Sequence, residues 1–128
     1  MSELVNEWIL ILTLVSCLLT LIHYIYRMLV YNETFIVDDA IITEWIEWIK
    51  TNHIPAIMAT GAFESFKALT VLDSPNEGIT YCIQYQGDSI ERYSDFYYKH
   101  MEDIHKAHNA QFEERFALFH TLMEEIDL

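Results

Sequence analysis

The distribution of hydrophobic and polar positions divides the chain into an apolar head and a longer body of alternating patterns. Residues 8–26 (WILILTLVSCLLTLIHYIY) contain no Asp, Glu, Lys or Arg. As a helix they would extend roughly 28 Å, which nearly matches the hydrocarbon core of a bilayer. We therefore expect a short acidic lead-in over residues 1–7, a transmembrane helix over residues 8–27 that contacts the membrane through residues 8–26, and a folded domain over residues 28–126.

The residues beside the apolar segment favour a retained span over a cleaved signal peptide. Glu3 and Glu7 precede it, where a signal peptide carries Lys or Arg, and no small-residue cleavage site follows. Arg27 is the one basic flanking residue, which favours a single-pass membrane protein with a cytoplasmic domain. Aromatic residues stand at both ends of the segment, as they do at a membrane interface: Trp8, Tyr24 and Tyr26.

Two other interpretations of the head stay open. The segment could be the core helix of a soluble fold, although it has no polar stripe. Alternatively, Met28 is the natural first residue, and the protein is then soluble and cytoplasmic. Charge favours this second alternative, because every acidic residue except Glu3 and Glu7 follows Met28, and an anionic membrane surface would repel a domain held so close to it.

The body alternates between strand-like and helix-like patterns. Apolar residues at helical spacing form two stripes, Ile41–Ile49 and Ile90–Ile104. Runs rich in β-branched and aromatic residues predict four strands: Leu29–Val37, Phe63–Leu72, Ile79–Gln86 and Arg115–Met123.

Local signals mark where the two helices begin and where the first one ends. Asp38 and Asp39 supply cap oxygens before the first stripe, and Asp88 begins a capping-box-like sequence before the second. Because a proline disfavours helix in the residue before it, Pro55 predicts that the first helix ends near Asn52 or His53. A short irregular stretch or one helical turn is expected to follow through Ile57 and Met58 to Gly61.

The order of the elements is strand, helix, strand, strand, helix, strand, which is the split βαβ pattern of a ferredoxin-like sandwich. We therefore predict an α+β fold, a βαββαβ sandwich preceded by one apolar N-terminal helix. Two helices cover only one face of such a sheet. Neither side of the first or last strand is clearly polar, so we expect a second copy to cover the open face in a homodimer.

Three runs in the body carry a resemblance to a known family: MLVYNETFIVDDAIITEWIEWIKTNHIPAIMATGAFESFKALTVL, NEGITYCIQY and ERFALFHTLMEEI. They resemble a family of small bacterial proteins, largely from Bacteroidetes, that is classed as a domain of unknown function. The resemblance covers residues 28–126. The chain is similar, more remotely, to the dimeric α+β barrel superfamily, whose members include cofactor-free monooxygenases, muconolactone isomerase-like enzymes and non-catalytic modules. The resemblance implies this fold and supplies no established activity.

Charge and cysteine content exclude several classes of protein. Seven Lys and Arg against 20 Asp and Glu give a net charge of −13, so the chain offers no basic surface for nucleic acid. Cys17 and Cys82 are too few and too far apart for a disulfide scaffold or a Cys-rich zinc site. His105 and His108 share a helical side, but His100 is badly placed to join them. We therefore expect no metal, and solvated or helix-ending roles for these histidines.

Two other histidines are candidate catalytic bases. His53 lies just before Pro55, His120 lies in the last strand, and an imidazole titrates near neutral pH. The alternative for His53 is a contact with the negative end of a helix, and the alternative for His120 is a core or interface position.

Three polar residues of the strands are candidate binding residues. Asn32 and Gln84 carry amides that would hydrogen-bond a developing oxyanion. Glu33 lies between two aromatic residues on one side of the first strand. It is either paired, for example with Lys67, or protects a sheet edge, or is a catalytic carboxylate with a raised pKa.

Two functions from different classes fit these features. The first is a non-enzymatic ferredoxin-like module, which would be a homodimeric interaction or small-molecule-binding domain tethered to a membrane by one helix. The alternative is a cofactor-independent enzyme of the monooxygenase or isomerase type, in which His53 or His120 abstracts a proton. The enzyme would need a cavity of roughly a few hundred Å³ containing at least one imidazole. With no Gly-rich phosphate loop and no nucleophile elbow in the sequence, we expect no cofactor.

Overall fold

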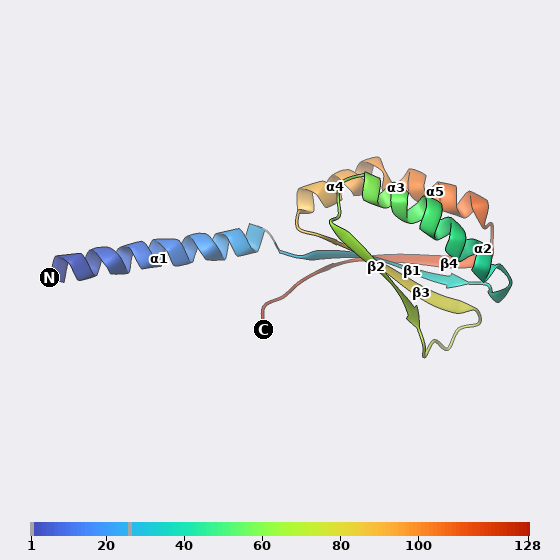
Figure 1. The fold of residues 1–128 in the computed structure, drawn as a ribbon, viewed down its shortest axis with the longest axis horizontal. Coiled ribbons are helices and arrows are strands. Elements are labelled where there is room, and N and C mark those ends of the chain that lie inside the picture. The colour runs from blue at the N-terminus through green and yellow to red at the C-terminus, as the bar shows by residue number, and fades with distance from the viewer. Residues whose placement is uncertain (1, 26) are drawn as a thin grey trace.

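A four-stranded antiparallel sheet with helices on one face forms the body of the protein (Figure 1). The structure is a computed structural model that describes residues 2–25 and 27–128. The strands are β1 (Leu29–Val37), β2 (Ser65–Val71), β3 (Ile79–Gly87) and β4 (Phe116–Glu124). They are arranged in the order β2-β3-β1-β4, with β1 and β3 in the middle. This topology confirms the predicted α+β, ferredoxin-like βαββαβ fold.

Two helical stretches cover the sheet from one side. The first consists of a 3₁₀ turn, η1 (Asp39–Ile41), then α2 (Ile42–Trp48), a π-helical turn, η2 (Ile49–His53), and α3 (Ile54–Ala59). The second consists of α4 (Ile90–Lys99) and α5 (Met101–Gln111). Figure 1 shows both stretches on the same face of the sheet.

The predicted cap of the first helical stretch is confirmed, and the cap of the second differs. Oδ1 of Asp38 accepts a hydrogen bond from the Ala40 N–H at 2.9 Å. At the second stretch the cap is Ser89 rather than Asp88, because Oγ of Ser89 accepts a hydrogen bond from the Arg92 N–H at 3.2 Å. Each cap satisfies one of the N–H groups that a helix start leaves without a partner.

The first helical stretch continues through Pro55, and the prediction that it ends near Asn52 or His53 is wrong. In an α-helix a proline lacks one N–H and its ring clashes with the carbonyl four residues earlier. Here the wider η2 turn precedes it, with the Ile54 N–H bonded to the carbonyl of Ile49. Pro55 then falls in the first turn of α3, where no intrahelical N–H is required. The same π turn keeps His53 buried on the side of the sheet.

The register of the strands determines which side chains face the helices. Residues directly opposite one another on adjacent strands share a face of the sheet. Glu33 of β1 is opposite Ile83 of β3 and His120 of β4, and all three face the helices. Asn32 is opposite Gln84, and both lie on the open face. The facing of His120, which sequence patterning leaves undecided, is therefore toward the helices.

The two faces of the sheet differ sharply in exposure. On the helix side the core contains side chains that are almost fully buried: Tyr31, Phe35, Ile83, Tyr85 and Phe96. On the open face Phe119 is 59% exposed, Leu69 is 44% exposed and Met123 is 40% exposed. The described chain therefore leaves an apolar area on the open face uncovered.

The N-terminal helix α1 (Ser2–Ile25) begins at Ser2, within the segment expected to precede it. Its residues Ser2–Ile22 are long and apolar enough to cross a membrane, and none of this span is buried in the structure. By length and composition alone, a signal sequence near an N-terminus would pass the same test. Figure 1 shows α1 extending away from the sandwich. The predicted interfacial residue Tyr26 and the side chain of Tyr24 lie outside the described part of the chain.

Candidate functional site

Glu33 is at the centre of a cluster of polar side chains on the helix side of the sheet. Its carboxylate is fully buried on the inner strand β1. Oε1 accepts a hydrogen bond from Nε2 of His53 at 2.8 Å, and Oε2 accepts one from Nε2 of His105 at 2.6 Å. The Tyr31 hydroxyl donates to Oε2 at 3.1 Å. Three donors from three different elements therefore hold one carboxylate, which we call the Glu33 cluster.

These contacts keep Glu33 ionised inside the core. Burial by itself would raise the pKa of this carboxyl, but the hydrogen bonds from His105 and His53, together with the charge of these rings, lower its pKa to about 2. An ionised carboxylate only accepts hydrogen bonds, so each histidine presents its Nε2–H to Glu33. Nδ1 is then the ring nitrogen that does not contact Glu33 in both His53 and His105.

Two tyrosines complete the surroundings of the carboxylate. Burial and the negative charge of Glu33 raise the pKa of Tyr31 and of Tyr85, so both hydroxyls stay protonated. The Tyr85 hydroxyl is fully buried and has no hydrogen bond of standard geometry to any residue that the structure describes. Nδ1 of His53 is buried and has no partner among the same residues.

His108 lies beside the cluster but has a structural role. Its Nε2 accepts a hydrogen bond from the Trp45 indole N–H at 3.0 Å, and its Nδ1–H donates to Oδ1 of Asn109 at 3.1 Å. Burial lowers the pKa of His108 to about 4, so the ring is neutral at pH 7. Both nitrogens are satisfied in this neutral form, and neither is available for a ligand.

Two cavities reach the histidines of the Glu33 cluster. The first, of about 390 Å³, lies between α4, α5 and β4, and we call it the His105 cavity. His105, His120 and Lys106 line it, and the ring centroids of the two histidines are 5.9 Å apart. The side chain of His105 is 15% exposed, so its ring reaches both Glu33 and the cavity. The second cavity, of about 330 Å³, is lined by His53 and by Asp103 of α5.

The structure separates the predicted site residues into two groups. His53, His120 and Glu33 lie on the helix side, whereas Asn32 and Gln84 lie on the open face. The amides therefore cannot hydrogen-bond an oxyanion held by these histidines, and that part of the hypothesis is wrong. The cause is the strand period of two, which places Asn32 and Glu33 on opposite faces.

Of the three interpretations of Glu33, pairing agrees with the structure, although the partners are His53 and His105. Lys67 lies on the open face, because it is opposite Gln84, and it cannot pair with Glu33. The carboxylate does not protect an edge, since β1 has a neighbour on each side. The pKa of Glu33 is lowered rather than raised. Its partners are histidines that the sequence places 20 and 72 residues away.

His105 is the main residue that the sequence interpretation missed. We assigned it and His108 to solvated or helix-ending roles, but both point toward the sheet, and His108 is fully buried. A signal was present, because Met101, Ile104, His105 and His108 follow the i, i+3, i+4, i+7 spacing of one helical face. The apolar stripe of the second helical stretch continues through these two histidines.

Within residues 2–25 and 27–128 no group of three or more His, Cys, Asp or Glu side chains is arranged to hold a metal ion. In the Glu33 cluster the histidine nitrogens contact the carboxylate oxygens directly, at 2.6 and 2.8 Å. Together with the Tyr31 hydroxyl, these nitrogens are the donors that the structure places on the two oxygens.

Comparison with known proteins relates the fold to solved structures and the sequence to one family. No curated protein matches the chain. An ethyl tert-butyl ether (EthD) family protein from Bacillus halodurans has 13% identity and a TM-score of 0.58, over 77% of this chain and 99% of that one. SnoaB, a cofactor-independent oxygenase from Streptomyces nogalater, has 11% identity and a TM-score of 0.57, over 80% and 96%.

A third solved structure, a dimeric ferredoxin-like protein from an uncultured marine organism, has 7% identity and a TM-score of 0.58, over 80% of this chain and 97% of that one. At such identities these similarities establish the fold alone, and they agree with the predicted likeness to dimeric α+β barrels. Residues 28–126 match the family described as domain of unknown function DUF4286, and the chain belongs to this family.

Proposed function

We propose that the domain binds a small organic molecule in the His105 cavity and removes a proton from it without a cofactor. The observation that carries this proposal is the ionised, fully buried Glu33, held by two histidines of which one reaches a surface cavity. Buried carboxylates whose pKa is strongly shifted gather at functional sites. The similarity to SnoaB, a cofactor-independent oxygenase, supports chemistry of this class on this fold.

His105 is the proposed catalytic base. Its Nε2–H is bound to Glu33 at 2.6 Å, so Nδ1 carries the lone pair that takes a proton from the ligand. The carboxylate stabilises the imidazolium that forms, as an acid residue does for a catalytic histidine in general. Lys106 lines the same cavity in an ion pair with Glu102, and its ammonium can donate a hydrogen bond to the anion that proton removal leaves on the ligand.

The two histidines predicted as bases have supporting roles in this proposal. His120 lines the His105 cavity and is exposed, so it can hydrogen-bond the ligand or exchange protons with water. His53 is fully buried on the other oxygen of Glu33, and it acts as a positioning residue that fixes the carboxylate.

A generic proton-abstraction probe tests the proposal. Ring opening of 5-nitrobenzisoxazole needs only a base: the C3 proton leaves, the N–O bond breaks, and a coloured nitrophenolate forms. We expect the full chain to accelerate this reaction, and His105→Gln to lower kcat/KM about a hundredfold. His100→Gln, at an exposed histidine between α4 and α5, is the matched control and keeps the wild-type rate. Equal rates for the two variants would refute the proposal.

We also propose that two copies pair through their open sheet faces. Phe119, Leu69 and Met123 leave apolar surface exposed there, and pairing would remove it from water. The dimeric state named for one structural neighbour supports this arrangement. The His105 cavity is on the opposite side of the sheet, so each copy would keep its own site.

The proposed location of the dimer is a membrane surface. The apolar span Ser2–Ile22 would cross the bilayer once, and its exposed side chains would contact lipid. Arg27 follows the span and favours a cytoplasmic domain. The anionic headgroups of the membrane would repel a protein of net charge −13, so the domain would lie close to the membrane without binding to those headgroups.

A further inference from the structure

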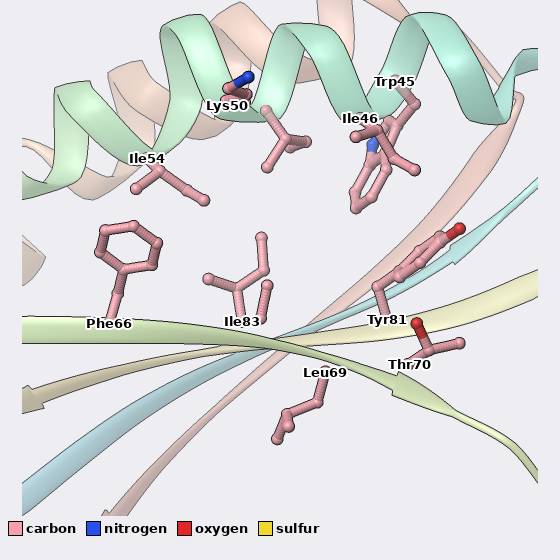
Figure 2. Close-up of a pocket in the computed structure, with 11 residues that line it drawn as sticks. Trp45, Ile46, Lys50, Ile54, Phe66, Leu69, Thr70, Tyr81 and Ile83 are labelled. Atoms are coloured by element: carbon pink, nitrogen blue, oxygen red, sulfur yellow. The ribbon is translucent and has the colours of Figure 1, made fainter.

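A third cavity lies between the first helical stretch and the edge strand β2 (Figure 2). Its volume is about 330 Å³, at the lower end of the range for small-molecule sites. The helix side and the sheet side are both apolar: the helical stretch contributes Ile46, Ile49 and Ile54, and the strands contribute Phe66, Ala68 and Ile83. We call it the β2 cavity.

One end of the β2 cavity is a rigid aromatic wall. Trp45 and Tyr81 stack there, with ring centroids 4.9 Å apart and an angle of 21° between the rings. The Trp45 indole N–H is fixed by its hydrogen bond to His108, so the wall does not depend on a ligand to form. A preformed apolar cavity of this kind favours an apolar ligand, because binding removes its surface from water.

The cavity is open because nothing in the described chain covers β2. Every residue of β2 is exposed, although Phe66 and Ala68 face the helices, and Phe66 is 48% exposed. The helices pack over the inner strands and leave this side of the edge strand accessible. A small molecule can therefore enter without unfolding any element.

Lys50 gives the cavity a positive charge at its helix side. It is exposed and lines the cavity (Figure 2). Most basic residues of the described chain form an ion pair with an acidic side chain: Arg27, Lys99, Lys106 and Arg115. Within that part of the chain Lys50 and Lys67 have no ion pair. In a protein of net charge −13, an unpaired ammonium beside an apolar cavity is suited to an anionic ligand.

We propose that the β2 cavity binds a medium-chain aliphatic carboxylate, with its alkyl chain between the isoleucines and Phe66 and its carboxylate on Lys50. The site is separate from the His105 cavity and shares no lining residue with it. The proposal therefore stands independently of the proton-transfer function.

Titration of the full chain with octanoate tests this site. The protein is kept in a nonionic detergent, and the NMR signal of the Trp45 indole N–H, at the wall of the cavity, reports binding. We expect saturable binding of octanoate with a Kd below about 10 mM, and binding of octanol about tenfold weaker because it lacks the charge. The fraction of ligand that partitions into detergent micelles is the same in every titration of that ligand, so a difference in affinity between two variants comes from the protein.

Two lysine variants give the decisive comparison. Lys50→Gln weakens octanoate binding about tenfold, whereas Lys67→Gln, on the opposite face of β2, leaves it unchanged. Ala68→Phe fills the cavity and abolishes binding, and an unchanged near-ultraviolet spectrum shows that this variant is folded. Absence of saturable octanoate binding, or equal affinities for the two lysine variants, would overturn the proposal.

Discussion

Replacing Glu33 by Gln tests the physical basis of the Glu33 cluster. The substitution keeps the shape of the side chain but removes its charge and gives the two histidines an amide in place of a carboxylate. The pKa of Glu33 is lowered from 4.5 to about 2. Because each pKa unit corresponds to about 1.4 kcal/mol, we expect the variant to lose about 3 kcal/mol of unfolding free energy at pH 7.

The loss has a characteristic pH dependence. Since the pKa of Glu33 is lowered in the folded state, the unfolded chain binds more protons than the folded one between pH 4.5 and pH 2. The stabilisation from Glu33 is therefore complete above about pH 4.5 and is lost as the pH falls toward 2. Burial lowers the pKa of His108 from 6.5 to about 4. The unfolded chain therefore binds a proton at His108 more readily than the folded one, and both proteins lose stability as the pH falls from 6.5 to 4. Because Glu33 also raises the pKa of His108, the difference between wild type and variant reports Glu33 most directly below pH 4.

Urea unfolding of the full chain in nonionic detergent, followed by near-ultraviolet circular dichroism at several pH values between 7 and 3, measures this difference. Glu44→Gln, at an exposed position of α2, is the matched control and should unfold as the wild type does. The reasoning is refuted if Glu33→Gln is as stable as the wild type at pH 7. It is also refuted if the two proteins differ by the same amount at pH 7 and at pH 3.

Two further predictions concern assembly and location. Phe119→Asp places a charge on the open face and should weaken the dimer at least about 30-fold, as measured by analytical ultracentrifugation. Ile90→Asp, on the helix side, is the control and should leave the dimer unchanged. Equal dimer stability for the two variants would contradict pairing through the open face. The full chain should stay with membranes after alkaline carbonate extraction, whereas a fragment of residues 28–128 should be released into the supernatant. Release of the full chain would argue against a membrane span in Ser2–Ile22.

The strands were predictable because their signal is local. A strand alternates its side chains with a period of two, so β1 was identified with its observed bounds, Leu29–Val37, although the pattern did not show which of its two sides faces the helices. β2 is shorter than predicted, Ser65–Val71 rather than Phe63–Leu72, and β4 ends one residue later, at Glu124. Such differences are expected, because the first and last residues of a strand depend more on tertiary contacts than on the alternation of hydrophobic and polar residues.

The Glu33 cluster was only half visible in the sequence. Glu33 and His53 were recognised as unusual, yet their pairing depends on a π turn that no local rule at Pro55 predicts. His105 contacts Glu33 across 72 residues of chain, and helical spacing alone does not show which histidine of a face reaches a given strand. The sequence identified the residue types of the site, and the tertiary fold decided which of them meet.

The strand β1 connects the proposed site with the proposed dimer. Glu33 points toward the helices, and its neighbour Asn32 points to the open face, where it is 9% exposed. Nδ2 of Asn32 donates to Oγ1 of Thr34 at 3.0 Å, but Oδ1 is buried without a partner among the described residues. A buried carbonyl oxygen without a donor costs about 1–3 kcal/mol. The chain itself already covers this oxygen, so a second copy could donate to it only if the Asn32 side chain turned outward, and the energy would then be recovered in one register only. The central strand would then fix the geometry of both assemblies, the acid–base cluster through Glu33 and the sheet pairing through Asn32.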